Sequence, residues 1–194
     1  MRLERQMVVR AALELLNSVG MDGLTTRRLA EALGVQGPAL YWHFKNKQEL
    51  IDEMARALLA QSYRPIAPGQ DWADWMAEGA RRLRSSLLSY RDGARLIAGY
   101  RPTGASRVNP DIWFGPLETA GFSRTDAIWA MIVVGQFTFG WTMDEQAAQG
   151  RSIPAERRLD PNAGFEFGLG AIIEGLQARL AKSKASEPVL EAQP

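Results

Sequence analysis

The sequence predicts an all-α fold, in which an N-terminal three-helix domain containing a helix-turn-helix is followed by a larger α-helical domain. No stretch of the chain alternates polar and apolar residues with a period of two, whereas apolar residues recur with a helical period. Glycine, proline and capping residues divide these periodic stretches into separate helices. The segment 64–70 (RPIAPGQ) interrupts them and indicates a domain boundary.

The first two helices are delimited by residues that favour helix ends. Gly20 is expected to stop the first helix, because glycine readily adopts the left-handed conformation found there. Thr25 can cap a second helix that runs through Leu33 and ends at Gly34. The buried face of the first helix is expected to contain Val9, Ala12, Leu13 and Leu16.

The third and fourth helices complete the N-terminal part. Pro38 suits the first turn of a third helix, where its missing N–H has no intrahelical partner. Asn46 with Glu49 three residues later resembles a capping box that opens a fourth helix. The apolar face of this helix is expected to contain Ile51, Met54, Ala55 and Leu58. We therefore expect a domain over 1–47 that is joined to the rest by the helix 46–62.

The remaining helices are expected to form a second domain over 63–182. A helix over 71–89 and a short one over 92–99 are followed by a helix that runs towards Ala120 and is disturbed by Pro116. Ser123 and Asp126 then open a long helix. A polar connection over 150–161 precedes a last helix over 162–182, and the polar residues 183–194 are expected to form a disordered tail.

The stretch from Ala127 to Met143 carries no charge and has two interpretations. It is about 17 residues long, at the short limit for crossing a bilayer, and it contains polar and glycine residues. We expect a helix that is buried on all sides within a helical bundle rather than a membrane span.

Composition excludes several kinds of chemistry. The chain has no cysteine and one histidine, His43, which excludes disulfides, thiolate nucleophiles and multi-histidine metal sites. The N-terminal residues MRLERQMVVR lack the apolar core of a signal peptide, so a cytoplasmic location is expected. Residues 1–48 carry seven Lys or Arg against four Asp or Glu, a balance compatible with nucleic-acid binding.

The segment from Thr25 to Lys47 predicts the DNA-reading element, because a helix-turn-helix can place its second helix in the major groove. The side chains expected to pack it together are Leu29, Ala30, Leu33, Val35, Leu40 and Phe44. Those expected to face DNA are Gln36, Gly37, Pro38, Ala39, Tyr41, Trp42 and His43. Arg27 and Gln36 suit base edges, and Thr25, Thr26, Tyr41 and Lys47 suit phosphates. The alternative is a plain helical hairpin whose aromatic residues are core.

The pattern LNSVGMDGLTTRRLAEALGVQGPALYWHFKNKQELID, residues 16–52, resembles the TetR family of bacterial transcriptional repressors. The similarity to the tetracycline repressors continues through YRDGARLIAGYRP, residues 90–102. The resemblance implies a homodimer that binds a palindromic operator on double-stranded DNA. It also implies that a small-molecule inducer enters the larger, ligand-binding and dimerisation domain and releases the DNA.

The resemblance also assigns roles to single residues of the reading element. The residues whose type matches DNA-contacting positions of tetracycline repressors are Thr26, Arg27, Pro38, Tyr41, Trp42, His43 and Lys47. Gly37 and Ala39 depart from the pattern, because the tetracycline repressors carry Gln and Thr there. We therefore expect a different operator sequence.

The inducer pocket departs further from the tetracycline repressors. Ile97 stands where those repressors have the histidine that binds the drug's magnesium, so neither a metal nor a cofactor is expected. Other drug-holding positions are also changed in type, at Tyr63, Gly79, Leu83, Tyr100 and Trp113, and Asp144 replaces a glutamate. The candidate lining residues are Tyr63, Leu83, Leu87, Tyr100, Arg101, Trp113, Leu117, Ile128, Ile132, Gln136, Phe139 and Met143. They suit an apolar or aromatic inducer, although any of them can be plain core.

A stripe of small residues on the last helix indicates a helix-packing face. Its members, with one larger neighbour, are Gly164, Gly168, Ala171, Ile172, Gly175 and Ala178. Glycine costs about 1 kcal/mol relative to alanine inside a helix, so several on one face indicate close approach of another helix. We expect the dimer interface here; packing within one chain is the alternative.

Two other functions compete with a ligand-responsive repressor. One is a DNA-binding regulator whose pocket is vestigial or answers to a protein partner. The other is a small enzyme that uses Arg101, Asp144 and Glu145 in the pocket. The sequence shows no nucleophile–base pair and no phosphate-binding loop, so we expect no enzymatic activity.

Overall fold

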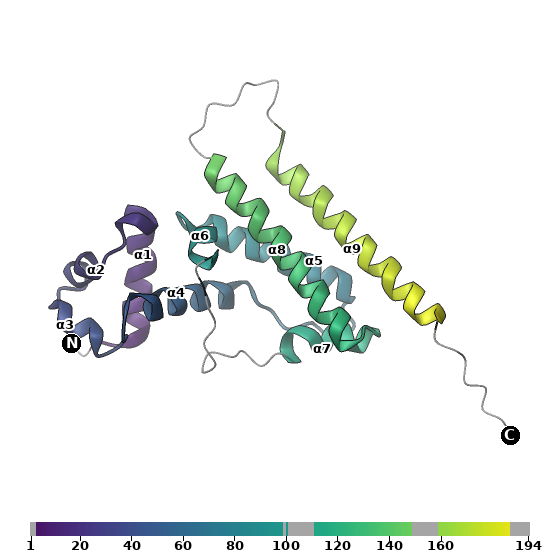
Figure 1. Ribbon diagram of the computed structural model, residues 1–194, viewed down its shortest axis with the longest axis horizontal. Helices are drawn as coiled ribbons and strands as arrows, with labels where there is room; N and C mark the ends of the chain where they lie inside the picture. The colour runs from purple at the N-terminus through teal and green to yellow at the C-terminus, as the bar shows by residue number, and fades with distance from the viewer. Residues whose placement is uncertain (1–2, 99, 101–110, 149–158, 187–194) are drawn as a thin grey trace. The chain divides into compact units, whose positions relative to one another are not determined.

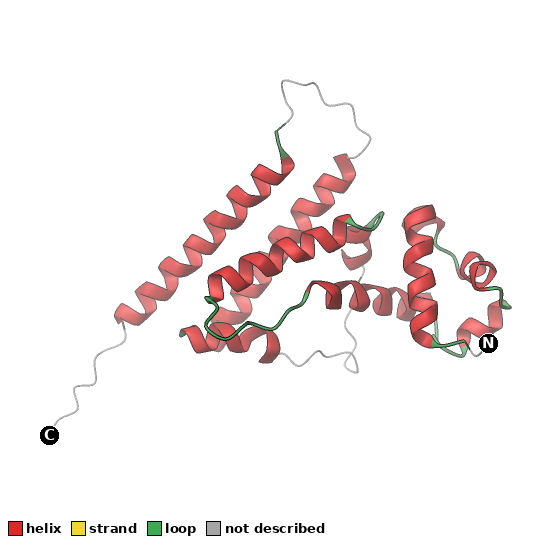
Figure 2. Cartoon of the chain, turned by 180° about the vertical axis from the view of Figure 1, so that it is seen from behind, coloured by secondary structure: helices red, strands yellow, loops and turns green. Residues whose placement is uncertain are grey.

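The computed structural model describes residues 3–98, 100, 111–148 and 159–186, and every regular element within them is an α-helix (Figures 1 and 2). The all-α prediction is therefore confirmed. The helices are α1 (Arg5–Gly23), α2 (Thr26–Leu33), α3 (Gly37–Tyr41), α4 (Lys47–Ser62), α5 (Trp72–Leu88), α6 (Gly93–Ala98), α7 (Asp111–Ala120), α8 (Arg124–Ala148) and α9 (Pro161–Ser186).

The described residues fall into two compact units. Unit 1 is drawn from Met1–Arg64, Arg81–Arg107 and Phe139–Arg151, and unit 2 from Pro65–Ala80, Val108–Thr138 and Ser152–Pro194. One division falls at 64–65, at the start of the Pro- and Gly-containing segment. The predicted second domain, 63–182, contributes residues to both units.

Unit 1 is built around one apolar core from α1, α2, α3, α4, the end of α5 and α6. Leu16, Leu29, Met54 and Leu58 are fully buried in it, and Ile97 of α6 joins them. The apolar periodicity thus identified the buried faces of α1 and α4, although Ile51 of the predicted α4 face is only half-buried. Gly20 has a φ of 70°, as the predicted stop requires, and helical backbone resumes after it up to Gly23.

The ends of α2 agree with the sequence. Thr25 Oγ1 accepts a hydrogen bond from Arg28 N–H at 3.2 Å. Gly34 adopts the left-handed conformation with φ 66°, and its N–H donates to the Glu31 carbonyl while Val35 N–H donates to that of Ala30. These two bonds form a Schellman motif, which satisfies carbonyls left open at the end of the helix.

The capping box predicted for α4 forms only in part. Asn46 Oδ1 accepts the N–H of Glu49 at 2.8 Å, as predicted. The Glu49 carboxylate, however, accepts the N–H of Lys45 at 2.7 Å, whereas a capping box would return it to Asn46. The reason is that Glu49 also pairs with Arg5 of α1, which draws its carboxylate towards that helix.

Unit 2 contains the first part of α5, α7, the first part of α8, and α9. Trp72 packs edge-on against Phe122 with ring centroids 4.9 Å apart, and Phe137 stacks on Phe165 at 5.4 Å. Ser123 caps α8 as predicted, because its Oγ accepts Asp126 N–H and donates to the Asp126 carboxylate.

One helix of unit 2 ends as predicted and another needs correction. α7 runs to Ala120, as predicted, with Pro116 inside it. α9 runs on to Ser186, so residues 183–186 of the predicted tail are helical, with Lys184 in the last turn, where a cation interacts favourably with the helix dipole. The rest of that tail, 187–194, and most of the predicted polar connection, 150–158, lie outside the described residues.

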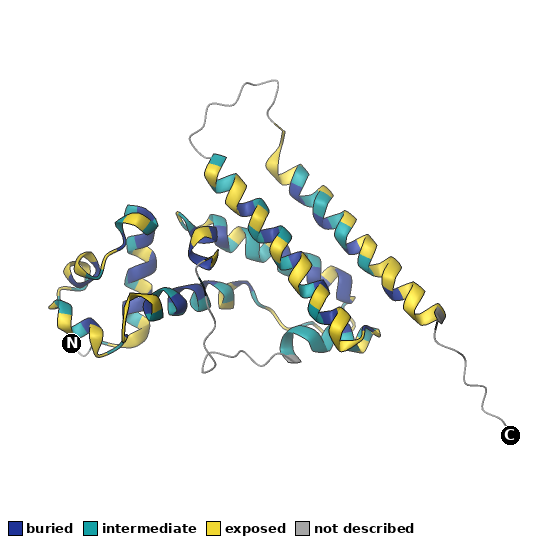
Figure 3. Cartoon of the chain, viewed as in Figure 1, coloured by how far each residue is buried: buried dark blue, intermediate teal, exposed yellow. Residues whose placement is uncertain are grey.

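The expectation that α8 is buried on all sides is wrong. Trp129 is 58% exposed, and Val133 and Ile132 are also exposed on the same helix. Exposed positions recur along α8 (Figure 3). The lack of charge on α8 therefore marks an apolar face left open in the single chain. Among the described helices, none is long and apolar enough to cross a membrane.

Candidate nucleic-acid interface

The α2–turn–α3 segment of unit 1 presents its aromatic residues in two opposite ways. Leu40 and Phe44 are buried in the unit 1 core. Tyr41 and Trp42, at the end of α3, are 57% and 88% exposed. Phe44 is therefore buried, and Tyr41 and Trp42 are exposed, as predicted. The alternative in which the aromatic residues are core fails for Tyr41 and Trp42. Exposing two large aromatic side chains side by side marks a surface that meets a partner.

The predicted DNA-contact residues all remain accessible on unit 1. The exposed ones are Thr25, Arg27, Gln36, Pro38, Tyr41, Trp42 and Lys47. The half-buried ones are Thr26, Gly37, Ala39 and His43. Three of the four phosphate candidates, Thr26, Tyr41 and Lys47, line one small hollow between α2, α3 and the start of α4. Their side chains are thus brought together although they are up to 21 positions apart in the sequence.

Space at Gly37, one of the two departures from the tetracycline-repressor pattern, is open. An added Cβ at Gly37 would meet no atom within 4 Å apart from its chain neighbours and its own helix. Ala39, the other departure, is half-buried two positions further along the same short helix. Nothing in the packing of unit 1 requires glycine at position 37, so its small size affects what this surface can contact.

Arg27 already has a partner in the described structure. Its Nε donates to Glu31 Oε1 at 3.0 Å, one helical turn along α2, and the two side chains are 88% and 61% exposed. Because an exposed pair of this kind is worth well under about 1 kcal/mol, Arg27 can exchange Glu31 for a base edge or a phosphate.

Arg5 holds the reading helix in place, a role that the sequence analysis missed. It donates to the His43 carbonyl and to the carboxylates of Glu49 and Glu53, the latter pairs at 2.8 Å and 2.6 Å. Its guanidinium also lies 4.6 Å from the centre of the Phe44 ring. Arg5 thereby links the start of α1 to the end of α3 and the first turns of α4.

The electrostatics of this cluster agree with its geometry. Partial burial lowers the pKa of Arg5, but the hydrogen bonds to Glu49 and Glu53 outweigh it and hold the pKa above its ordinary value. The hydrogen bond from Lys45 N–H, followed by that from Arg5, holds the pKa of Glu49 below its ordinary value. Both groups therefore stay charged at neutral pH. No local sequence signal could reveal the cluster, since Arg5 and Glu49 are 44 positions apart.

The candidate inducer residues are distributed over both units. Unit 1 holds Tyr63, Leu83, Leu87, Tyr100, Phe139 and Met143, and unit 2 holds Trp113, Leu117, Ile128, Ile132 and Gln136. Leu87 and Leu117 are fully buried, whereas Ile132, Gln136 and Met143 are exposed. Arg101 lies outside the described residues. The described residues contain no cluster of three or more His, Cys, Asp or Glu side chains that could hold a metal ion.

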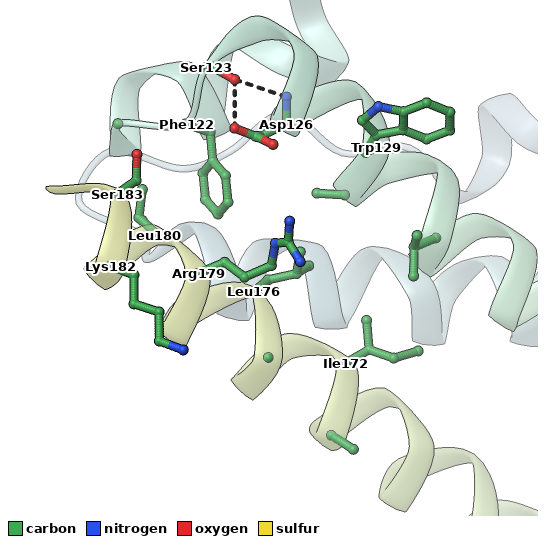
Figure 4. Close-up of a pocket in the computed structure, with 15 residues that line it drawn as sticks. Phe122, Ser123, Asp126, Trp129, Ile172, Leu176, Arg179, Leu180, Lys182 and Ser183 are labelled. Atoms are coloured by element: carbon green, nitrogen blue, oxygen red, sulfur yellow. Dashed lines mark hydrogen bonds between the residues drawn. The ribbon is translucent and has the colours of Figure 1, made fainter. Parts of the chain in front are cut away.

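The small-residue stripe of α9 borders a long groove in unit 2. The groove has a volume of about 870 Å³ and runs between the start of α8 and the second half of α9. Phe122 and Arg179 project into it (Figure 4). Of the predicted interface residues, Ala171, Ile172 and Gly175 line it, Ala178 is exposed, and Gly164 is half-buried.

Gly168 of this stripe is explained by packing within the chain. An added Cβ at Gly168 would lie 2.6 Å from the Phe137 ring of α8, too close for any side chain. The alternative of intrachain packing therefore accounts for Gly168. Gly175 differs, because it is exposed and an added Cβ there would meet no such atom within 4 Å.

Comparison with known proteins places this arrangement in a family. Residues 8–54 match the family of bacterial regulatory proteins named tetR, and residues 64–158 match the tetracyclin repressor-like C-terminal domain. The chain is 42% identical to the tetracycline repressor protein class A from transposon 1721 of Escherichia coli, over 92% of each chain.

Solved structures are also similar. A TetR variant from Acinetobacter baumannii AYE in complex with minocycline has a TM-score of 0.82 and 42% identity, covering 92% of this chain and 99% of that one. BioQ with its natural double-stranded DNA operator has a TM-score of 0.73 and 35% identity, covering 91% of this chain and 99% of that one. The chain therefore belongs to the tetR family of bacterial regulatory proteins, as a DNA-binding helix-turn-helix repressor and not an enzyme.

Proposed function

We propose that this repressor binds a palindromic operator as a homodimer and is released by a small apolar or aromatic inducer other than tetracycline–magnesium. The exposed Tyr41–Trp42 pair at the end of a helix whose other face is buried carries the proposal. Arg27 and Lys47 flank this surface with positive charge and are exposed. Such a surface combines apolar contacts to bases with cationic contacts to phosphates.

The proposed operator differs in sequence from those of tetracycline repressors. Gly37 and Ala39 carry no hydrogen-bonding side chain where those repressors have Gln and Thr, so two groups that could read bases are missing. Gln36 is exposed at the start of α3 and can contact adenine through both its amide N and O atoms. Specificity would therefore depend more on Arg27 and Gln36.

The proposed homodimer uses the open faces of α8 and α9. Trp129 and Val133 are exposed on α8 and line the groove that Ala171 and Gly175 border on α9. A second copy would remove these apolar side chains from water, which is the main driving force for association. A twofold dimer places its reading helices about one DNA turn, ~34 Å, apart.

The chemistry of position 97 supports the proposed class of inducer. Ile97 is 7% exposed and belongs to the unit 1 core. An aliphatic side chain has no donor atom for a metal, so the magnesium ion that the tetracycline repressors bind through a histidine loses that ligand here. The overall similarity to those repressors supports a ligand-responsive fold, while this substitution argues against their ligand.

The experiment starts with selection of a duplex from a randomised DNA pool, followed by titration of compounds against that complex. We expect apolar aromatic compounds to release the duplex and tetracycline with magnesium to leave it bound. Release by tetracycline with magnesium at micromolar concentration would overturn the proposed inducer class. If no compound releases the DNA, the regulator with a vestigial pocket or a protein partner is the better description. Trp42→Ala is the control that should lose the selected duplex.

A further inference from the structure

The turn between α5 and α6 is held from two sides, and one of them is a single glutamine of α8. Gln146 Nε2 donates to the carbonyls of Leu87 and Tyr90, at 3.1 Å and 2.8 Å. Gln146 Oε1 accepts the N–H of Ala94 at 3.1 Å. The side chain thus uses both its donor and its acceptor groups on one turn, a combination that glutamate cannot provide.

The backbone of this turn is strained and tightly packed. Asp92 has a φ of 60°, a conformation that residues other than glycine rarely adopt. An added Cβ at Gly93 would lie 2.2 Å from the Leu87 carbonyl oxygen, so only glycine fits. A turn in this state persists only where surrounding contacts hold it, and Gln146 binds the same Leu87 carbonyl.

The other side of the turn is attached to the end of α1. Arg91 N–H donates to Asn17 Oδ1 at 2.8 Å, and Asp92 Oδ2 accepts the N–H of Met21 at 2.8 Å. Arg95 adds a two-pronged ion pair with Asp22, at 2.7 Å and 2.9 Å. The hydrogen bonds from Arg95 hold the pKa of Asp22 below its ordinary value. The end of α1 is therefore positioned by the turn that Gln146 clamps.

We infer that Gln146 is a positioning residue that sets the α5–α6 turn against α1 and thereby maintains the DNA-reading geometry of unit 1. The path runs from α8 through three hydrogen bonds to the turn, and from the turn through Asp92 to Met21. The neighbouring Glu145 strengthens the anchor, because it pairs with Arg84 of α5 at 2.9 Å with both side chains largely buried. A shift of this end of α8 would consequently move the turn and α1 together. The inference rests on the proposed function, since it names the element through which an inducer can act.

The test compares Gln146→Glu with Ala147→Glu in the full chain. Both variants add one carboxylate to neighbouring positions of α8, but Ala147 is exposed. Hydrogen–deuterium exchange is measured at the N–H groups of Ala94 and Met21. In Gln146→Glu we expect both to exchange about fivefold faster, the factor for roughly one hydrogen bond lost. The N–H of Met21 donates to Asp92 and not to Gln146, so a merely local role of Gln146 would leave its exchange unchanged.

Operator affinity gives the second readout. Gln146→Glu should weaken binding of the selected duplex while the slope of affinity against salt stays unchanged, because no phosphate contact is lost. If Gln146→Glu fails to fold, Gln146→Asn takes its place in the test. Asparagine keeps the amide but is one methylene too short to make the same hydrogen bonds to the turn. If the folded Gln146 variant exchanges the Met21 N–H at the same rate as Ala147→Glu does, the inference is overturned. Failure of the wild-type protein to bind any duplex refutes the proposed function instead, and the exchange comparison still decides the role of Gln146.

Discussion

Arg27 Nε and Glu31 Oε1 lie 3.0 Å apart on the exposed surface of α2, so a candidate base-reading guanidinium is paired with a carboxylate before DNA arrives. Binding through Arg27, as proposed, would break this pair and bring Glu31 towards the phosphates of the duplex. Both effects would oppose association. We therefore expect Glu31 to lower operator affinity without contacting DNA itself.

Replacing Glu31 by Gln should consequently tighten operator binding. We expect a gain of about twofold, since an exposed pair one helical turn apart is worth roughly 0.3–0.5 kcal/mol. Fluorescence anisotropy at several salt concentrations measures it. Glu14→Gln, an equal charge change on the exposed side of α1, is the control. Equal gains in the two variants would show that net charge, and not release of Arg27, is responsible.

Replacing Arg5 by Ala should destabilise unit 1 and weaken operator binding together. The change removes the pairs with Glu49 and Glu53 and the contact with Phe44. The Arg5 side chain is 42% exposed, so solvent screening limits the expected loss to about 1 kcal/mol of unfolding free energy. Denaturant titration measures it, with Arg10→Ala on the same helix as the control. A loss no greater than in that control would contradict the role assigned to Arg5.

The lowered pKa of Glu49 predicts how stability depends on pH. Its carboxylate is favoured in the folded state, first by the Lys45 N–H and then by Arg5. Its stabilising contribution is therefore present above its ordinary pKa of 4.5 and is lost as pH falls through the lower folded value. The difference in unfolding free energy between wild type and Glu49→Gln should be constant near neutral pH and shrink below about pH 4.5.

Repeating the measurement in an Arg5→Met background tests whether Arg5 contributes to the lowered pKa of Glu49. Removing Arg5 removes one cause of the lowered pKa, so the difference between Glu49 and Glu49→Gln should be smaller at neutral pH. It should begin to shrink at the same pH, near the ordinary pKa, and its loss should be complete at a higher pH than in the wild-type background. A difference that stays constant down to about pH 3 in the wild-type background would refute the expectation.

Replacing Trp129 by Asp should dissociate the proposed dimer. Trp129 is 58% exposed in the single chain and lines the groove beside α9. A buried aromatic residue at an interface centre is commonly worth about 2 kcal/mol or more, or roughly 30-fold in the dissociation constant. Sedimentation velocity measures the oligomeric state, with Leu159→Asp as the control because Leu159 is 89% exposed ahead of α9. A dimer of undiminished affinity in the Trp129 variant would exclude this face.

Local features of the fold could be predicted because their determinants lie within a few positions of one another. The cap of α2 at Thr25, the left-handed end at Gly34 and the cap of α8 at Ser123 all connect residues at most five apart. The buried faces of α1 and α4 followed from the helical period for the same reason. The DNA-reading motif shares this property, since α2 and α3 are separated by a short turn.

Features that depend on distant partners could not be predicted in this way. The capping box of α4 was expected to close on itself, but Arg5 draws Glu49 away, and nothing near Glu49 in the sequence indicates it. Gly168 was predicted to belong to an interface stripe, yet the Phe137 ring of the same chain fills the space where a side chain at position 168 would lie. The uncharged stretch of α8 was expected to be buried on all sides, because composition cannot show which face of a helix the rest of the chain covers.

By itself, the sequence determined the helices, their capped ends and the helix-turn-helix, because backbone hydrogen bonds and apolar periodicity act over one or two turns. Only the tertiary structure decided that Arg5 reaches two carboxylates of α4 and that Gln146 holds the α5–α6 turn. These contacts require whole helices to pack, which brings together side chains separated by more than forty positions.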